Sequence, residues 1–484
     1  MKKIFITLLL ALNFVSFANA KDSVVLGLRL EPPHLDPTEN AAAAIDEVVY
    51  GNIFEGLFQI KQDGSVKKLL ATDYKISNSG KTYTISIKDN VYFHNGNKLT
   101  ADDVVFSLNR INAEGSKNPR KAVFGNIKSV SAKGKYKVVI ELKNQSGGLI
   151  YNLALPEAVI FDKSDYKNNK TNPVGTGAFK FVKMKKGYFV ELNRNEKYHG
   201  QQAKLKTVKF RFIADALSAS ASMLSGEVDG FPVYNDVMTL NGFKNTKFDV
   251  VMGSTEGEVL VAINNKNKYL KNKKVRQALN HAIDKKALIE VVSPGATAIG
   301  SHYPPHGKAY VDLSNKYPYD VNKAKALLKQ AGAENMTIDF MVPPPYKMSA
   351  DVVAGYLRKA GIGVKIKIVD WGTWLSSVFK KGQYGISIIA HVETNDYDIY
   401  ANPNYYFGYD NKKYQNLITK IKRETNEAKR IKLLKQAQNI LADDAVNVWL
   451  YQMTKIGVWN KNLKGLWKNA PVEGNILKDV YWNE

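Results

Sequence analysis

The chain of 484 residues contains no cysteine. This absence excludes disulfide bonds, thiolate zinc sites, catalytic cysteines and the lipid-modified cysteine of a lipoprotein. Histidine is also scarce, with seven residues. We therefore expect no resident metal or other cofactor. A chain of this length without covalent cross-links has to be stabilised by a large packed core.

Long hydrophobic runs are missing beyond the first twenty residues, so no later stretch approaches the roughly 18–20 apolar residues that cross a bilayer. Residues 1–20 read MKKIFITLLLALNFVSFANA, with a basic start, an apolar run and a small-residue cleavage site. This layout is typical of a secretory signal peptide. We expect a periplasmic protein that starts near Lys21 and carries no lipid anchor, and a retained N-terminal anchor is the alternative.

Acidic residues are outnumbered, with 45 Asp and Glu against 69 Lys and Arg, which gives a formal net charge of +24. Basic chains often bind nucleic acid or anionic membranes. Here the lysines are scattered along the chain, and an exported protein rarely meets nucleic acid. We interpret the charge as a lysine-rich surface and expect no nucleic-acid partner. Attraction to anionic lipid or to an anionic partner is the alternative.

The motifs of common enzyme classes are missing as well. Residues 172–179, NPVGTGAF, contain two glycines but lack both the P-loop Lys-Ser/Thr pair and the glycine spacing of a dinucleotide loop. Residues 253–257, GSTEG, do not place serine at the centre of a nucleophile elbow. Because no nucleophile, base and metal set assembles elsewhere, we predict that the protein is not an enzyme.

The chain does contain an alternation of strand-like and helical patterns from end to end. Thr100 followed by Asp103 predicts a capped helix start, and residues 178–195 predict a hairpin. Beyond Leu260, strand and helix patterns alternate. Such alternation predicts β-α-β crossovers and a mostly parallel sheet. The sequence therefore predicts an α/β fold with two or more domain-sized units.

Carboxylates and tyrosines gather between His391 and Phe407, directly after a predicted strand at 384–392. An open α/β sheet binds its ligands where strands end. A carboxylate there can pair with an ammonium group, and aromatic faces attract cations by about 0.5–2 kcal/mol each. The segment suits a positively charged or amphipathic small ligand, or its tyrosines pack in the core while its acids face water. Its candidate ligand contacts are Asn395, Asp396, Tyr397, Asp398 and Tyr400.

Four stretches, in order, resemble the extracytoplasmic solute-binding proteins of ABC importers, in the branch (family 5) of dipeptide, oligopeptide and nickel binders. They are residues 71–111, 172–181, 225–231 and 260–289. The resemblance implies a two-lobed periplasmic binding protein of type II-like α/β fold that closes by a hinge, with an extra domain inserted in the first lobe. It implies lobe I at 21–55, 170–258 and 455–484, the inserted domain at 56–169, and lobe II at 259–454.

The resemblance also implies where a ligand is held. In peptide-binding relatives an aspartate after a second-lobe strand holds the amino terminus of the peptide, and Asp396 aligns best, with Asp398 next. Dipeptide binders add an arginine for the ligand carboxylate, where this chain has Pro344. Lys347 is nearby but lacks the fork of an arginine.

Nickel-binding relatives use arginines near the inserted domain to hold an anionic chelator. This chain has Glu157 at one such place, with Arg120 as a candidate contributor. Flat aromatic walls suit small-ligand sites, although the same side chains also serve as packing. The further candidates for the cleft wall are Tyr346, Trp371, Trp374 and Tyr451.

We predict a monomeric periplasmic protein that captures short peptides in an interlobe cleft and delivers them to inner-membrane ABC permease subunits. One alternative is a binder of nickel, or another metal, held as a histidine-like chelate, with His34 and His391 as the candidate ligands. Another alternative, of a different class, is a periplasmic chaperone-like protein that binds unfolded segments in the same cleft.

Overall fold

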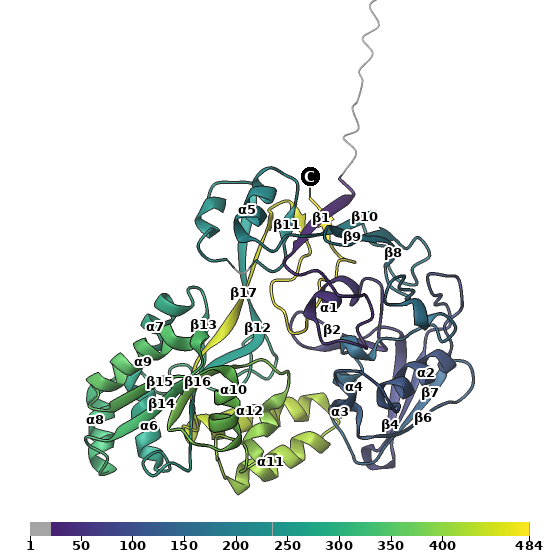
Figure 1. Ribbon diagram of the computed structural model, residues 1–484. Helices are drawn as coiled ribbons and strands as arrows, with labels where there is room; N and C mark the ends of the chain where they lie inside the picture. The colour runs from purple at the N-terminus through teal and green to yellow at the C-terminus, as the bar shows by residue number, and fades with distance from the viewer. Residues whose placement is uncertain (1–20, 235, 484) are drawn as a thin grey trace, which may run out of the picture.

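The computed structural model describes residues 21–234 and 236–483. The predicted signal peptide, residues 1–20, lies outside the described residues and stays a prediction. Within the described ranges, no helix is both long and apolar enough to span a bilayer. The mixed α/β structure forms two lobes and a further domain that packs beside the first lobe (Figure 1).

One large sheet runs through both lobes. Its strands are β1 (Ser23–Leu28), β8 (Phe179–Lys185), β9 (Phe189–Arg194), β10 (Thr207–Phe212), β11 (Gly230–Phe231), β12 (Phe248–Ile263), β13 (Thr297–Ala298), β14 (Thr337–Val342), β15 (Gly363–Ile368), β16 (Ile386–His391) and β17 (Val448–Asn460). Their order is β15-β14-β16-β12-β17-β11-β1-β10-β9-β8, and β13 pairs with β17. The long strands β12 and β17 pass between the two lobes (Figure 1).

The parallel part of the sheet predicted for lobe II is formed by β14, β15 and β16. β14 pairs in parallel with both β15 and β16, as β-α-β alternation requires. β12 is antiparallel to both of its neighbours in this lobe, β16 and β17. The prediction is therefore wrong at β12, because this strand carries the chain into lobe II while β17 carries it back out.

Lobe I has its core around β1, β9 and β10. Helix α1 (Ala43–Val49) buries Ile45 and Val48 in that core. The helix is short because the chain turns at Gly51, whose φ of 69° favours glycine. The other elements of this lobe are α5 (Ala216–Leu224), η4 (Leu240–Phe243), β18 (Leu463–Lys464) and β19 (Tyr481–Trp482).

The inserted domain has a core of its own, whose buried residues run from Leu57 to Val174. Its sheet has the order β4-β5-β7-β6, and a separate hairpin joins β2 to β3. At the start of helix α2 the carboxylate of Asp103 accepts hydrogen bonds from the backbone and hydroxyl of Thr100, as predicted. The strands are β2 (Phe58–Ile60), β3 (Val66–Lys68), β4 (Ala71–Ser77), β5 (Thr82–Ile87), β6 (Ile127–Ala132) and β7 (Lys137–Leu142), and the helices are η1 (Asn78–Gly80), α2 (Ala101–Asn112), α3 (Lys121–Phe124), α4 (Leu149–Asn152), η2 (Pro156–Ala158) and η3 (Tyr166–Asn168).

Lobe II places its helices on both faces of the sheet. They are α6 (Lys273–Ala282), α7 (Lys285–Val292), α8 (Val321–Gln330), η5 (Pro344–Tyr346), α9 (Lys347–Lys359), α10 (Trp371–Thr373), η6 (Trp374–Lys380), η7 (Asp396–Ala401), α11 (Lys412–Arg423) and α12 (Glu427–Asp443). One face carries an aliphatic core, and the other a core rich in aromatic rings. Tyr400 and Tyr406 belong to the aromatic core, so the packing alternative for the tyrosines after β16 applies to these two.

The pairing of β12 with β17 changes near the junction of the lobes. The register shifts between Ser254 and Glu258, so the ladder is interrupted there. Interruptions of this kind bend a strand and re-aim its side chains. The interrupted stretch places Glu256 and Glu258 beside the cavity described next. The domain limits expected from the sequence stay a prediction.

Candidate ligand-binding site

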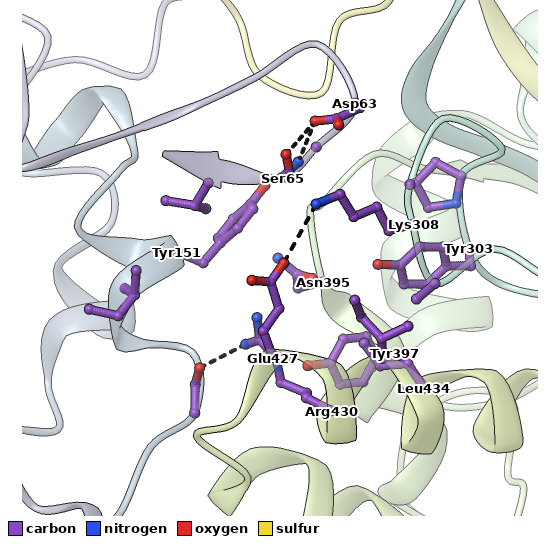
Figure 2. A pocket seen from close by; sticks show the side chains of 18 of the residues that line it. Asp63, Ser65, Tyr151, Tyr303, Lys308, Asn395, Tyr397, Glu427, Arg430 and Leu434 are labelled. Carbon is purple, nitrogen blue, oxygen red and sulfur yellow. Dashed lines mark hydrogen bonds and ion pairs between the residues drawn. The ribbon is translucent and has the colours of Figure 1, made fainter. Parts of the chain in front are cut away.

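A cavity of about 450 Å³ lies between the inserted domain and lobe II. Figure 2 shows Ser65 and Tyr151 on the inserted-domain side, across from Tyr303 and Tyr397 of lobe II. The volume falls within the range of roughly 300–1,000 Å³ that is usual for small-ligand sites. Aromatic rings with a few charged groups are also the usual lining of such sites, so the cavity is the candidate binding site.

The segment after β16 enters this cavity, as the sequence predicts for the ligand side of the sheet. Asn395 has a left-handed backbone with φ of 59°, which asparagine tolerates better than most residues. The turn leads into η7, and Asn395, Asp396 and Tyr397 all line the cavity. The structure therefore brings these three predicted residues together.

The carboxylate of Asp396 lies within a chain of buried acidic and imidazole groups. Nε2 of His302 donates to Asp396 Oδ1, and Nδ1 of His302 forms an ion pair at 2.6 Å with Oε2 of Glu258. Nδ1 of His391 lies 3.5 Å from Asp396 Oδ2. We call Glu258, His302, Asp396 and His391 the carboxylate–imidazole chain.

Burial and pairing set the charges along the carboxylate–imidazole chain. Burial raises the pKa of Glu258 to about 7, and the charge of His302 opposes that rise. Burial lowers the pKa of His302, but Asp396 and Glu258 more than offset this and hold it well above its usual range. Burial also raises the pKa of Asp396, yet His302 outweighs it and the pKa stays below the ordinary value. At neutral pH an ionised Asp396 therefore faces a protonated His302.

A second histidine fastens the same loop of lobe II to β12. Nε2 of His306 lies 2.8 Å from Glu256 Oε1, and its Nδ1 lies 2.7 Å from the hydroxyl of Ser254. Four residues of this region were not predicted as site residues: Glu256, Glu258, His302 and His306. The available signal was the spacing of the glutamates, because residues i and i+2 of a strand share a face.

Basic groups line another part of the cavity wall, near α12. Nη1 of Arg430 donates to the carbonyl oxygen of Gly147 at 2.7 Å, and Nζ of Lys308 lies 4.0 Å from Glu427 (Figure 2). Tyr303 is close to both an acidic and a basic side chain. Burial raises the pKa of Tyr303, Glu256 raises it further, and Arg430 acts in the opposite direction. The cavity therefore offers acids and bases to one ligand.

Comparison with known protein families decides the class of the molecule. The model of Bacterial extracellular solute-binding proteins, family 5 Middle, matches residues 65–416. The chain belongs to this family.

Individual relatives extend the match over nearly the whole chain. The oligopeptide-binding protein AppA of Bacillus subtilis strain 168 is 29% identical over 494 residues, which cover 92% of this chain and 88% of AppA. The periplasmic binding protein DppA of Helicobacter pylori, in complex with the peptide STSA, has a TM-score of 0.70 at 26% identity and covers 96% of this chain and 99% of its own. The unliganded open form of the murein tripeptide binding protein MppA has a TM-score of 0.87 at 20% identity. The match covers 96% of this chain and 97% of the MppA chain.

Three further residues predicted for the family 5 cleft lie in packed environments outside this cavity. Tyr400 is 1% exposed and stacks on Phe407, while its hydroxyl lies 3.3 Å from Nδ1 of His302. Trp374 is buried, and its indole N–H donates to Ser387 at 2.9 Å. Tyr451 packs in the aliphatic core of lobe II. Tyr400 thus contacts His302, a residue of the cavity wall, without lining the cavity itself.

The charged candidates outside the cavity each have a partner on the protein. Asp398 pairs with Lys422 at 2.5 Å, and Lys347 pairs with Asp351 one helical turn away at 2.8 Å. Nε of Arg120 donates to Glu157 at 3.2 Å.

Two aromatic candidates lie beyond the cavity wall. Trp371 is 53% exposed and stacks on Trp374. The hydroxyl of Tyr346 accepts from the backbone N–H of Ala390. The ligand-binding roles predicted for all these residues stay predictions.

The two candidate metal ligands lie in different places. Nδ1 of His34 accepts from the backbone N–H of Asp36 at 3.2 Å, and His34 does not line the cavity that the described residues form. Nε2 of His391 lies 3.0 Å from the hydroxyl of Tyr406. Its other nitrogen faces the cavity segment, and ligand atoms of His391, Glu393 and Asp396 lie within 4.8 Å of one another.

Proposed function

We propose that this protein captures short peptides in the cavity between the inserted domain and lobe II and delivers them to the permease subunits of an ABC importer. The main support for this proposal is the charge of the cavity wall, which combines the carboxylates of Asp396 and Glu393 with the cations Lys308 and Arg430. A peptide is a zwitterion, so its two termini can pair with both. AppA and DppA, whose names or titles state peptide binding, support this choice of ligand.

The amino terminus of the peptide pairs with Asp396 in this proposal. Its carboxylate is ionised and mostly buried, with 15% of the side chain exposed. A charge in such a place interacts more strongly than one in water. An ammonium group at Asp396 Oδ2 adds a positive partner to an oxygen whose nearest imidazole nitrogen is 3.5 Å away.

Capture requires the lobes to move, and β12 with β17 is the proposed hinge. The register shift between Ser254 and Glu258 supports this, because an interrupted ladder bends more easily than a regular one. Closure then shields the ligand from water.

The proposal also covers export, location, oligomeric state and mode of action, for which the family and the sequence are the support. Residues 1–20 act as a cleaved export signal, and the absence of cysteine leaves no site for a lipid anchor. The mature protein works in the periplasm as a monomer. It binds its cargo without chemical conversion, as a solute-binding protein rather than as an enzyme.

A metal chelate is the second candidate cargo, because of the cluster formed by His391, Glu393 and Asp396. One imidazole nitrogen and two carboxylates suit a divalent transition metal whose other ligands come from a chelator. The cluster shares Asp396 with the proposed amine site, so peptide and chelate would compete.

Calorimetry separates the two cargoes. We expect heat of binding when the protein is titrated with a mixture of dipeptides and tripeptides, and none when it is titrated with nickel and free histidine. Binding of nickel-histidine without any binding of peptide would reverse the order of the two candidates.

A further inference from the structure

The two lobes touch at a second place, away from the hinge strands. Residues 145–147 of the inserted domain meet residues 422–430, which comprise the end of α11, the turn that follows it and the start of α12, and we call this contact the clasp. The N–H of Gly147 donates to the carbonyl of Lys422 at 2.7 Å. The carbonyl of Gly147 accepts from Arg430 at 2.7 Å, and the side-chain amide of Gln145 donates to the carbonyl of Arg423 at 2.7 Å.

Gly147 fits the clasp because it has no side chain. A Cβ atom at this position would lie 1.9 Å from the carbonyl oxygen of Glu424, which is backbone and cannot rotate away. Gly147 does not have a positive φ, so its requirement is close approach rather than backbone conformation. Any larger residue therefore has to push the two sides of the clasp apart.

Both sides of the clasp are anchored to regular structure. The hydroxyl of Tyr83, on β5, donates to the carbonyl of Ser146 at 2.6 Å. Arg430 lies in the first turns of α12, whose start is capped by the side chain of Asn426 on the N–H of Lys429. The contact thus joins the inserted domain to the longest helix of lobe II, through groups that are each held in place.

The clasp forms part of the cavity wall. Gly147, Thr425, Glu427 and Arg430 all line the cavity. Arginine carries five N–H donors, and the only acceptor for its guanidinium among the described residues is the carbonyl of Gly147. The other donors are available for a carboxylate, so a peptide whose carboxyl terminus reaches Arg430 would end at the clasp.

We propose that the clasp sets the upper length of the peptide that this protein accepts, an inference that rests on the proposed function. In this inference a short peptide has its amino group at Asp396 and its carboxylate at Arg430, which both line the cavity of about 450 Å³. A longer peptide must break the three clasp hydrogen bonds to extend past Gly147. The clasp thus selects against long peptides without contacting the side chains of short ones.

Gly147→Ala tests this role, and Gly148→Ala is the matched control. A Cβ at Gly148 would have Ser146 Oγ as its nearest neighbour, at 3.9 Å, so alanine fits there. The first measurement needs no ligand: small-angle scattering of the purified proteins. We expect a larger radius of gyration for Gly147→Ala than for wild type and Gly148→Ala. Equal radii of gyration for wild type and Gly147→Ala would contradict the proposed role of the clasp.

The second measurement is retention of random peptide pools of fixed length, three and nine residues, read by native mass spectrometry. We expect wild type and Gly148→Ala to favour tripeptides, and Gly147→Ala to reduce that preference by about tenfold, since it removes several hydrogen bonds. Arg430→Gln should weaken tripeptide binding and lower the preference in the same direction without a steric clash.

A failure of peptide binding and a failure of the length limit would give different results. If wild type retains neither pool, the proposed function is wrong, and the length limit falls with it. If wild type retains tripeptides but Gly147→Ala and Arg430→Gln keep the same length preference, peptide binding stands and the role of the clasp is wrong.

Discussion

Among the single residues, those of the carboxylate–imidazole chain set the charge along one side of the cavity. Asp396 is predicted because its loop follows a strand at the ligand side of the sheet and because it aligns best with the amine-binding aspartate of the family that the chain resembles. Its environment could not be predicted, because His302 and Glu258 come from distant parts of the chain and meet Asp396 only after lobe II has folded. The sequence therefore indicates the ligand contact but not the groups that set its charge.

Asp396→Asn should weaken the binding of short peptides by about 10- to 100-fold, the usual range for a lost hydrogen bond to a charged group. N-acetylated peptides should bind wild type about as weakly as free peptides bind the variant, because both changes remove one partner of the same ion pair. Calorimetry with free and acetylated tripeptides measures both effects.

Asp398→Asn is the matched comparison, since Asp398 pairs with Lys422 outside the cavity. A larger loss for Asp398→Asn than for Asp396→Asn would contradict the assignment of the amine site.

Glu258 makes the stability of the protein depend on pH. Its folded-state pKa, about 7, lies above the ordinary value of 4.5, so its stabilising contribution is complete below 4.5 and is lost as pH rises through 7. Glutamine does not ionise, so the Glu258→Gln variant does not lose stability in this way. The free energy of unfolding of the variant minus that of wild type should therefore increase by about 1–3 kcal/mol between pH 5 and pH 8. Urea denaturation at the two pH values measures this, and a constant difference would show that Glu258 does not titrate as described.

At the scale of elements, the connection between β12 and the loop at 302–306 supports the cavity. The hairpin of β8 and β9, the capped start of α2 and the alternation in lobe II are local patterns, and the sequence predicts them correctly. The antiparallel direction of β12 is not predicted, because it depends on the path of the chain between lobes rather than on a local pattern. The same holds for the contact of Gly147 with the turn before α12.

His306→Ala should loosen β12 from this loop. The imidazole contacts Ser254 and Glu256, so its removal breaks two polar contacts and should lower the free energy of unfolding by about 1–3 kcal/mol. Peptide affinity should fall as well, because Glu256 lines the cavity. Denaturant unfolding and calorimetry measure the two effects.

His281→Ala is the control for this change, because His281, on α6, is half-buried and has its Nδ1 2.8 Å from the carbonyl oxygen of Pro318, away from the cavity. Equal losses in the two variants would mean that His306 has no special role in fastening β12.

At the scale of the whole molecule, two lobes, an inserted domain and a cavity between them agree with the family to which the chain belongs. Resemblance alone predicts this architecture, since its four motifs follow one another in the family's order between residues 71 and 289. It does not predict the place of Trp371, Tyr346 or Tyr451, which lie outside the cavity, because a motif reports the fold and not the course of a ligand through it.

In the proposed function, a short peptide is held between lobes that close over it. Small-angle scattering of the wild-type protein, with and without a saturating tripeptide pool, tests this directly. We predict a smaller radius of gyration with the peptides than without them, and no change when the pool is replaced by its N-acetylated form at the same concentration. An identical scattering curve at peptide concentrations that calorimetry shows to be saturating would contradict closure between the lobes.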